Sequence, residues 1–501
     1  MTEIQLFLWI GLAAFLVLIL GIGIYSGKKT KSVRDFAIGG GQLGPVVLGL
    51  SFTGTYLSAA AFLGYPGWSY EYGYSNLWLF LAIMGGGPIG VLMVAKRARK
   101  INTTQQSLSL PDWLGDYYSS DFLRIATSII LLFNIFYIAA QFVAGARIFE
   151  YLLEIPYGNA LMTTTIIVII YVYVGGAIAD VYTDAIQVIL MAVTGLLVFV
   201  SGIVLFWEGG LSETFSAITA KLTAQDSDLG RVFHPESDYF YSLPAVIGAL
   251  LIQWAFASAP HLFNKVLGVK DERDLGKMIF VYVVTKLCCL AVFFGGFYSR
   301  AHLGDQVVMS DLALVEYMVR VFPAVIAALM IVVILAAAMS TTDGLFVSIS
   351  TVFANDIFLK VLVRRGILKM SKRRAEKTAL LVSRVATVGA GILACLLVLN
   401  PPRYMADIQW LGISGIAAGT LGPILYAVYG KKKAHARAAE FSMVIGLTSY
   451  LVLYFGGIEK SAMAAGAWAT LIGIGLMIVL ANTLKAPKKV QQHAEKAVKA
   501  K

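Results

Sequence analysis

Consecutive oxygen-bearing side chains lie in the middle of one of the most apolar stretches of the chain. The stretch runs from Phe322 to about Phe358, and residues 340–343 near its centre read Ser-Thr-Thr-Asp. In hydrocarbon such groups are costly unless they have polar partners inside a helix bundle. Hydroxyl and carbonyl oxygens are also the ligands that a hard monovalent cation needs.

The spacing of these residues predicts a cation site. On a helix, Ala337, Ser340 and Thr341 are spaced i, i+3, i+4, so one carbonyl and two hydroxyls share a face. The alternative is that the Ser and Thr hydroxyls bond the carbonyl four residues earlier in their own helix. The stretch alone favours that alternative, and the rest of the chain reverses the preference.

The composition is that of a membrane protein. The 501 residues are 58% hydrophobic and 14% charged, and their mean hydropathy is +0.77. Apolar runs of about 20 residues recur along the chain, and each is long enough to span a bilayer as a helix. The net charge of +11 comes from basic residues gathered in short loops, which indicates cytoplasmic loops and not a nucleic-acid-binding face. The three cysteines have no metal-ligand spacing and predict no disulfide framework.

The apolar runs predict an all-α polytopic membrane protein with about thirteen transmembrane helices. The first run, about Gln5 to Tyr25, lacks a basic leader and a cleavage site, so we expect it to be a retained helix. Basic clusters follow the first, third, ninth, eleventh and last runs, and all fall on one side of the membrane. Positive loops stay in the cytoplasm, so this pattern predicts an external N-terminus and a cytoplasmic C-terminus in a bacterial-type inner membrane.

Two of the predicted spans contain helix-breaking residues. Gly54, Gly64, Pro66 and Gly67 interrupt the second span, and Ser258-Ala-Pro260 interrupts the seventh. Unwound backbone is tolerated at that depth only where it lines a cavity or coordinates something. Paired interrupted spans in two halves of opposite orientation therefore indicate a transporter's binding site. A simple kink without a site is the alternative for each break taken singly.

Several motifs together resemble the solute:sodium symporter family over about residues 32–485. The most specific is Gly175-Gly-Ala-Ile-Ala-Asp-Val-Tyr-Thr-Asp-Ala-Ile-Gln187, which is similar to the family's Gly-Gly…Thr-Asp…Gln signature, and residues 336–341 resemble its sodium-site helix. Residues 53–67 and 141–150, with Ile155-Pro-Tyr, look like the pantothenate and monocarboxylate branch. The sugar and proline branches fit those stretches less well.

The resemblance implies a LeuT-like core of two inverted repeats of five helices, each with a discontinuous helix, and alternating access driven by a sodium gradient. No cofactor other than the coupling ion is implied. The expected parts are an N-terminal helix and cytoplasmic loop (1–43), the first repeat (44–207), an external loop (208–240), the second repeat (241–430), and two C-terminal helices with a basic tail (431–501).

The resemblance also implies the ligands of the main sodium site. They are the carbonyl oxygens of Gly54, Leu57 and Ala337 and the hydroxyls of Ser340 and Thr341. Five oxygens without a formal charge suit an ion that must be released in each cycle.

A second cation site stays open. In some family members an Asp matching Asp184 helps to hold a second sodium beside hydroxyls one turn beyond the first site, but this chain has Asp343 and Gly344 there. Two neighbouring carboxylates cannot both stay ionised cheaply in a low-dielectric interior unless a cation lies between them. Either a second sodium bridges Asp184 and Asp343 or one of them carries a proton, and we favour a single sodium. For Asp184 alone, a helix N-cap is the simpler alternative.

Lys286 is the candidate counter-charge for an anionic solute. An unpaired ammonium within a span costs about 3 kcal/mol, and the sugar branch of the family has a substrate-contacting lysine at the matching position. Snorkelling of Lys286 to the cytoplasmic interface is the alternative. Neutral hydrogen-bonding candidates on neighbouring spans are Thr55, Tyr56, Ser58, Asn134, Gln141, Gln253, Trp254 and Ser258.

The sequence therefore predicts a sodium-coupled symporter that imports a small organic monocarboxylate, with the anionic solute, sodium and the lipid bilayer as its partners. An amino acid such as proline, or a sugar, on the same scaffold is the alternative. A membrane enzyme would need a convergent His, Cys or carboxylate cluster at one membrane face, which the five histidines do not provide. A channel is less favoured, because paired broken helices indicate a closed midplane site. The oligomeric state stays open.

Overall fold

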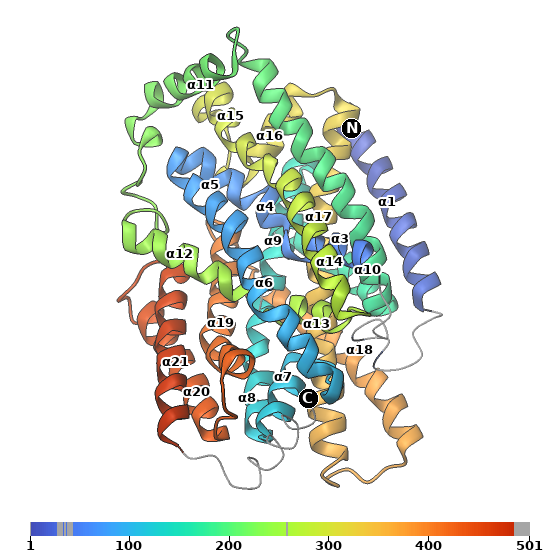
Figure 1. The fold of residues 1–501 in the computed structure, drawn as a ribbon. Helices are drawn as coiled ribbons and strands as arrows, with labels where there is room; N and C mark the ends of the chain where they lie inside the picture. The colour runs from blue at the N-terminus through green and yellow to red at the C-terminus, as the bar shows by residue number, and fades with distance from the viewer. Residues whose placement is uncertain (1, 28–33, 35–36, 38–43, 257–258, 485–501) are drawn as a thin grey trace.

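The predicted all-α membrane fold is confirmed. The computed structural model describes residues 2–27, 34, 37, 44–256 and 259–484. All regular secondary structure in this part is helical, and the helices pack as one upright bundle (Figure 1). Eleven helical stretches in the same ranges are long and apolar enough to cross a membrane. The boundaries of the two repeats stay a prediction.

The helices follow one another along the chain with short connections. The first half contains α1 (Glu3–Gly27), α3 (Pro45–Tyr56), α4 (Ala59–Phe62), α5 (Gly64–Tyr72), α6 (Leu77–Gln105), α7 (Leu110–Tyr118), α8 (Asp121–Ile130), α9 (Asn134–Leu153) and α10 (Tyr157–Leu205). The second half contains α11 (Leu211–Gln225), α12 (Leu243–Ala255), α13 (Pro260–Leu267), α14 (Leu275–Leu290), α15 (Phe294–Leu303), α16 (Ala313–Val321), α17 (Ala324–Thr351), η10 (Val352–Val363), α18 (Lys372–Leu397), α19 (Met405–Tyr429), α20 (Ala436–Phe455) and α21 (Ala462–Thr483).

Two of the thirteen predicted spans have no separate counterpart among the eleven apolar helical stretches. The span predicted over residues 44–67 is divided among the short helices α3, α4 and α5. In the span predicted over 157–174, the apolar stretch Tyr157–Ile170 is shorter than the other spans.

Helix α10 also differs from the sequence prediction. We expect two spans over residues 157–174 and 183–207, but one helix runs from Tyr157 to Leu205. Near its first residue, Tyr157 Oη donates to Val398 O at 2.9 Å, and near its last residue the hydroxyls of Ser201 and Tyr317 are 2.9 Å apart. Within α10, the apolar stretches Tyr157–Ile170 and Asp180–Leu205 correspond to the two predicted spans.

The two predicted helix breaks are confirmed. Helix α3 ends at Tyr56, its C-cap Leu57 is extended, and Ser58 caps α4 by accepting a hydrogen bond from Ala60 N at 3.2 Å. In the second half, α12 ends at Ala255 and α13 begins at Pro260. Proline suits the first turn of a helix because its missing N–H needs no partner there.

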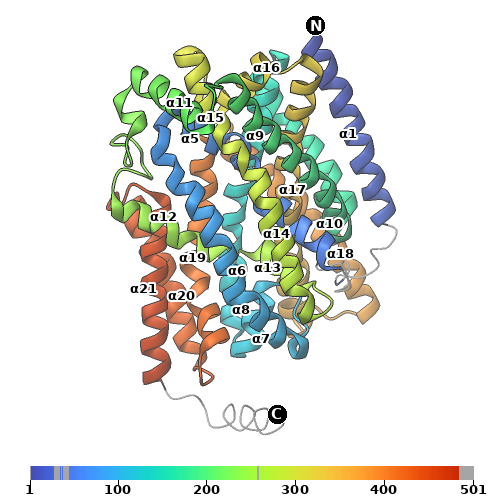
Figure 2. The same cartoon turned by 45° about the horizontal axis from the view of Figure 1, so that its top comes forward.

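Helix α17 forms the centre against which the broken helices pack. Every residue from Met330 to Thr351 is buried, and α3, α4, α10 and α13 all contact this helix. A helix that is buried on all sides can hold polar side chains only where its neighbours offer partners. At the periphery, α1 and the pair α20–α21 lie at opposite edges of the bundle in both views (Figures 1 and 2).

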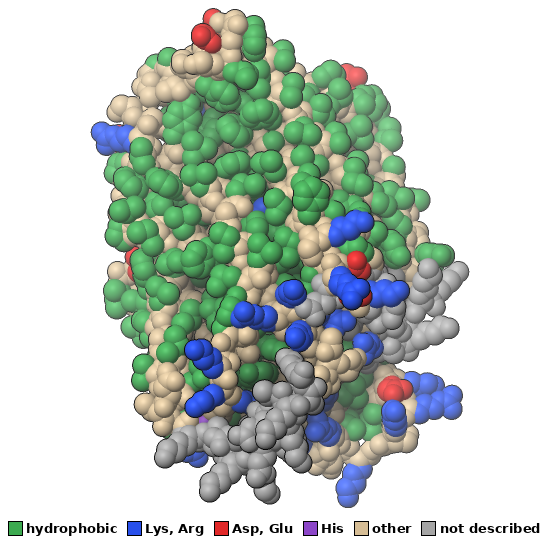
Figure 3. Space-filling view, viewed as in Figure 1, with side chains coloured by type: hydrophobic (Ala, Val, Ile, Leu, Met, Phe, Trp, Pro, Cys, Tyr) green, Lys and Arg blue, Asp and Glu red, His purple; other side chains and the backbone are tan. Residues whose placement is uncertain are grey.

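The surface divides into an apolar band and a basic end. In Figure 3 apolar side chains cover the upper part of the molecule, and Lys and Arg side chains gather toward the lower end. Exposed apolar residues such as Leu92, Val193 and Phe455 lie on the spanning helices. This distribution is that of a protein embedded in a bilayer, with its positive loops on one side.

The basic end should face the cytoplasm, because short loops rich in Lys and Arg are retained there. In a background with Cys288, Cys289 and Cys395 replaced by Ser, we expect Lys221→Cys on α11 to react with a membrane-impermeant maleimide in intact cells. Lys432→Cys, in the exposed loop after α19, should react only after permeabilisation. The opposite labelling pattern would invert the topology.

Candidate functional site

The central hydroxyls of α17 meet the carbonyl end of α3. Ser340 Oγ lies 3.0 Å from Gly54 O and 3.0 Å from Ala337 O. Thr341 Oγ1 lies 3.4 Å from both Gly54 O and Thr55 O. Because α3 ends at Tyr56, its last carbonyls have no partner within the helix. The hydroxyls of α17 satisfy these carbonyls in the interior of the bundle.

Five buried, uncharged oxygens therefore converge from two helices. Their contacts of 3.0–3.4 Å are the spacing that neighbouring ligands take around a hard cation, since such ions bind oxygen at about 2.3–2.6 Å. The back-bonding alternative describes Thr342, whose Oγ1 donates to Ala338 O at 2.5 Å. Ser340 differs in part, because its hydroxyl lies 3.0 Å both from Ala337 O of its own helix and from Gly54 O of α3. The hydroxyl of Thr341 reaches the carbonyls of α3.

Four of the five predicted sodium ligands are brought together: Gly54, Ala337, Ser340 and Thr341. The carbonyl of Thr55, which the sequence does not single out for this role, joins them. Leu57 is the extended residue directly after α3. A ligand role for the Leu57 carbonyl stays a prediction.

Asp184 and Asp343, the predicted second cation site, also lie together, and Asp180 joins them. One carboxylate oxygen from each of the three lies within 4.8 Å of the other two. A cation is already present at this cluster: Lys265 Nζ lies 2.6 Å from Asp184 Oδ2 and 2.9 Å from Asp180 Oδ2. The sequence leaves a second sodium or a proton as the choices at this place, and the structure adds a third possibility, the ammonium of Lys265. The helix N-cap interpretation of Asp184 is wrong, because Asp184 lies inside α10.

Lys265 and Asp180 are site residues that the sequence analysis misses. Lys265 lies near the end of the seventh predicted span, close to the charged segment that follows it. A lysine within a span is nevertheless the same signal that singles out Lys286. Asp180 precedes Asp184 by one helical turn and belongs to the same signature.

Thr55 connects the oxygen site to the carboxylates. Its hydroxyl donates to Asp184 Oδ2 at 2.8 Å, and Ser51 Oγ donates to the same oxygen at 2.9 Å. The carbonyl of Thr55 faces Thr341 Oγ1. Thr55, predicted as a solute-binding residue, therefore contacts the oxygen site with its carbonyl and the carboxylate cluster with its hydroxyl.

Lys286 is fully buried, with 0% of its surface exposed. Its Nζ donates to Ile83 O at 2.8 Å and to Tyr282 Oη at 3.0 Å, and it lies 5.0 Å from the ring centre of Tyr56 and 4.6 Å from that of Tyr282. The snorkelling interpretation is therefore wrong. All of these partners are neutral, so the ammonium is held by a carbonyl, a hydroxyl and two aromatic faces.

A small cavity lies beside the ammonium. Tyr56, Ser58, Tyr65, Ile83, Gln253 and Phe256 are among its lining residues. Tyr56 Oη donates to Gln253 Oε1 at 3.0 Å across it. Its volume of about 10 Å³ has room for about one water. An organic solute can enter only if the helices around the cavity move apart.

The other predicted solute residues have different positions. Ser58 Oγ donates to Gln409 Oε1 at 2.8 Å, and Gln141 Oε1 accepts from Ala59 N at 3.0 Å, so both brace the break in the first half. Asn134 is buried, and its amide has no hydrogen-bond partner in the described part of the chain. Trp254 is 41% exposed, so its role in solute binding stays a prediction. Ser258 lies outside the described residues.

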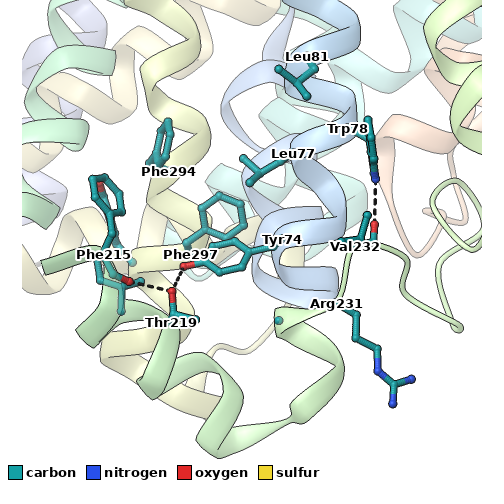
Figure 4. A pocket seen from close by; sticks show the side chains of 13 residues that line it. Tyr74, Leu77, Trp78, Leu81, Phe215, Thr219, Arg231, Val232, Phe294 and Phe297 are labelled. Carbon is teal, nitrogen blue, oxygen red and sulfur yellow. Dashed lines mark hydrogen bonds between the residues drawn. The ribbon is translucent and has the colours of Figure 1, made fainter. Parts of the chain in front are cut away.

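A larger cavity of about 490 Å³ lies between α6, α11 and α15 (Figure 4). Its wall is mainly apolar and aromatic, and two of its polar groups are already bonded: Tyr74 to Thr219 at 2.7 Å, and Trp78 Nε1 to Val232 O at 2.9 Å. Arg231 points away from the ring cluster and pairs with Asp228 at 3.0 Å. The one cationic side chain among the described lining residues is therefore already paired with a carboxylate.

The fold is that of a membrane transporter, and the central oxygens are its candidate ion site. The chain belongs to the sodium:solute symporter family, whose family model matches residues 36–446. It is therefore an integral plasma membrane protein with sodium as its coupling ion, and it is a transporter and not an enzyme.

Relatives of this chain carry different solutes. The chain is 28% identical over 458 residues to a sodium/pantothenate symporter of Haemophilus influenzae, with 89% of this chain and 90% of that one covered. It is 26% identical to an osmoregulated proline transporter of Bacillus subtilis, with 90% and 89% covered. It is also 26% identical to a sodium/proline symporter of Escherichia coli, with 96% and 94% covered.

Solved structures confirm the predicted LeuT-like fold. A Na⁺-coupled sialic acid symporter in a substrate-bound outward-open state matches with a TM-score of 0.76 at 20% identity, covering 96% of this chain and 99% of that one. MhsT in complex with L-phenylalanine matches with a TM-score of 0.51 at 12% identity, covering 87% and 97%.

Removing one hydroxyl from the oxygen site should weaken sodium binding. We expect Ser340→Ala and Thr341→Ala each to raise the sodium concentration for half-maximal uptake about tenfold, because a hydrogen-bonding group that faces a charge contributes roughly 1.5–3 kcal/mol. The measurement is the sodium dependence of initial uptake rates in proteoliposomes. Ser350→Ala is the matched control, since its hydroxyl bonds Val347 O of its own helix. Unchanged sodium dependence in both test variants would place the ion elsewhere.

Proposed function

We propose that this chain imports a small organic monocarboxylate together with sodium by alternating access. The observation that carries the proposal is the Lys286 ammonium, which is buried at the centre of the bundle and held by neutral groups. An ammonium at this depth is costly. A solute carboxylate that reached it would supply the missing counter-charge.

The position of Lys286 supports a role in solute binding. Its contacts Tyr56 and Ile83 both line the small central cavity, and Tyr56 is the last residue of the broken helix α3. The next carbonyls back along α3, those of Thr55 and Gly54, belong to the proposed sodium site. One broken helix therefore contacts both the proposed ion and the proposed solute, so that binding of one can favour binding of the other.

The cavity lining favours a net anion over a zwitterion. Proline also carries a carboxylate, but its amino group needs an acceptor of opposite charge or several neutral acceptors. The cavity is lined by aromatic, hydroxyl and amide side chains and contains no Asp or Glu among its described lining residues. Transport of pantothenate by named relatives agrees with a monocarboxylate, and the proline transporters among the relatives keep an amino acid as the second candidate.

Contacts on both sides of the centre support alternating access. At one end, Trp68 packs on Tyr239 with ring centres 4.5 Å apart, and Arg403 pairs with Glu71 at 3.1 Å. At the basic end, Lys360 of η10 pairs with Asp112 of α7 at 3.1 Å. Opening one set of contacts while the other stays closed would expose the central cavity to one side at a time.

An uptake screen tests the solute class. Proteoliposomes with an inward sodium gradient are given labelled pantothenate, lactate, pyruvate, acetate, proline or glucose, each with potassium replacing sodium as the control. We expect sodium-dependent uphill accumulation of at least one monocarboxylate, and weaker uptake of proline and glucose. Preferential accumulation of proline or glucose would contradict the proposal.

The charge of Lys286 should be needed for binding of the anion. We expect Lys286→Ala to raise the KM for the transported monocarboxylate about 30-fold or more, because leaving a buried charge unpaired costs roughly 2–5 kcal/mol. Lys286→Arg keeps the charge and should lose less. Lys277→Ala is the control, since Lys277 is an exposed lysine of the same helix. Normal solute affinity in Lys286→Ala would assign recognition to the neutral groups of the cavity.

A further inference from the structure

Lys265 is buried among carboxylates, and 6% of its surface is exposed. One of these carboxylates, Asp184, also bonds Thr55 of the proposed sodium site. Lys265 Nζ lies 2.6 Å from Asp184 Oδ2, 2.9 Å from Asp180 Oδ2 and 2.5 Å from Ser51 Oγ. An ammonium has three N–H donors, and these contacts use all of them. Lys265 belongs to α13, but its partners belong to α3 and α10.

Stability alone is a poor explanation for this cluster. Taking an ammonium and its carboxylate partners out of water is costly, and replacing such groups with apolar residues is often neutral or stabilising. The contacts instead join three helices around the first break. Thr55 extends them to the sodium site, because its hydroxyl bonds Asp184 at 2.8 Å and its carbonyl faces Thr341 Oγ1 at 3.4 Å.

The oxygens around Lys265 are those that a metal cation would use. Asp180, Asp184 and Asp343 each place one carboxylate oxygen within 4.8 Å of the other two, which is a suitable cage for an ion. A metal cation between Asp180 and Asp184 would meet the ammonium at close range, and like charges repel strongly in a low-dielectric interior. The adjoining cavity, lined in part by His261 and Asn264, measures about 20 Å³ and has room for about one water.

We propose that the Lys265 ammonium is a built-in cation that takes the place of a second coupling ion between Asp180 and Asp184. This inference rests on the proposed sodium-coupled function and fixes its stoichiometry. The ammonium is tethered to α13 and is never released, so each solute moves with one sodium from the site of Gly54 and Ser340. Lys265 is a positioning residue: it holds Asp184, which holds Thr55, which supplies a carbonyl to the sodium site.

Counting sodium in the wild-type protein is the first test. Equilibrium binding of radioactive sodium to the purified full chain in lipid nanodiscs should saturate at one ion per chain. The sodium dependence of uptake should be first order. Two ions per chain would overturn the inference and leave sodium-coupled transport standing. If no saturable sodium binding occurred, the proposed function itself would be wrong.

Removal of the ammonium is the second test. Lys265→Ala leaves Asp180 and Asp184 without their cation, and we expect the variant to bind two sodium ions per chain and its uptake to become second order in sodium. Lys265→Arg keeps the charge and should bind one. Lys270→Ala, an exposed lysine in the following segment, should match the wild type.

A structural ion pair predicts a different outcome. Losing it would lower the yield or the activity of Lys265→Ala without adding a bound ion. A folded Lys265→Ala protein that binds one sodium therefore contradicts the inference. If Lys265→Ala does not fold, the wild-type count still decides between one ion and two.

Discussion

The structure depends on the early end of helix α3. Once the helix stops at Tyr56, its last carbonyls lose the intrahelical N–H groups that would otherwise satisfy them. In the middle of a membrane bundle no bulk water can replace those groups, so the partners must come from protein or from a bound ion. Ser340 and Thr341 of α17 supply hydroxyls at 3.0–3.4 Å. These hydroxyls cannot satisfy every lone pair that faces them, and the remaining oxygen capacity suits a monovalent cation.

The same break lies between the proposed ion site and the proposed solute site, and hydrogen bonds and ring contacts link it to both. On one side, the carbonyl of Thr55 belongs to the oxygen site, while its hydroxyl bonds Asp184 and, through it, Lys265 of the second broken helix. On the other side, Tyr56 contacts Lys286 and Gln253 at the central cavity. A movement of α3 or α13 during opening would therefore change both the proposed ion site and the proposed solute site. With the ion and the solute at these proposed sites, the arrangement would couple them without any contact between the two.

Much of the fold could be predicted from the sequence, because hydropathy, basic loops and the Gly and Pro residues of the breaks are local signals. The i, i+3, i+4 spacing of Ala337, Ser340 and Thr341 likewise predicted one side of the proposed sodium site. The side formed by α3 depends on which carbonyls face α17 near the break. Without the path of the backbone, the sequence could not show that the carbonyl of Thr55 faces Thr341. Lys265 was missed because its burial depends on how α13 packs against α3 and α10. The exposure of Trp254 could not be predicted, because the rotation of α12 decides whether an aromatic residue is exposed or faces the bundle.

The central claim is that ion and solute are bound by one broken helix and so favour each other. The most direct measurement is the affinity of the purified protein for its transported monocarboxylate, by calorimetry at zero and at saturating sodium, together with the affinity for sodium with and without that solute. The account predicts that sodium tightens solute binding and that the solute tightens sodium binding by the same factor, since coupling free energies are reciprocal. A solute affinity that does not change with sodium, in protein that binds both, would contradict it.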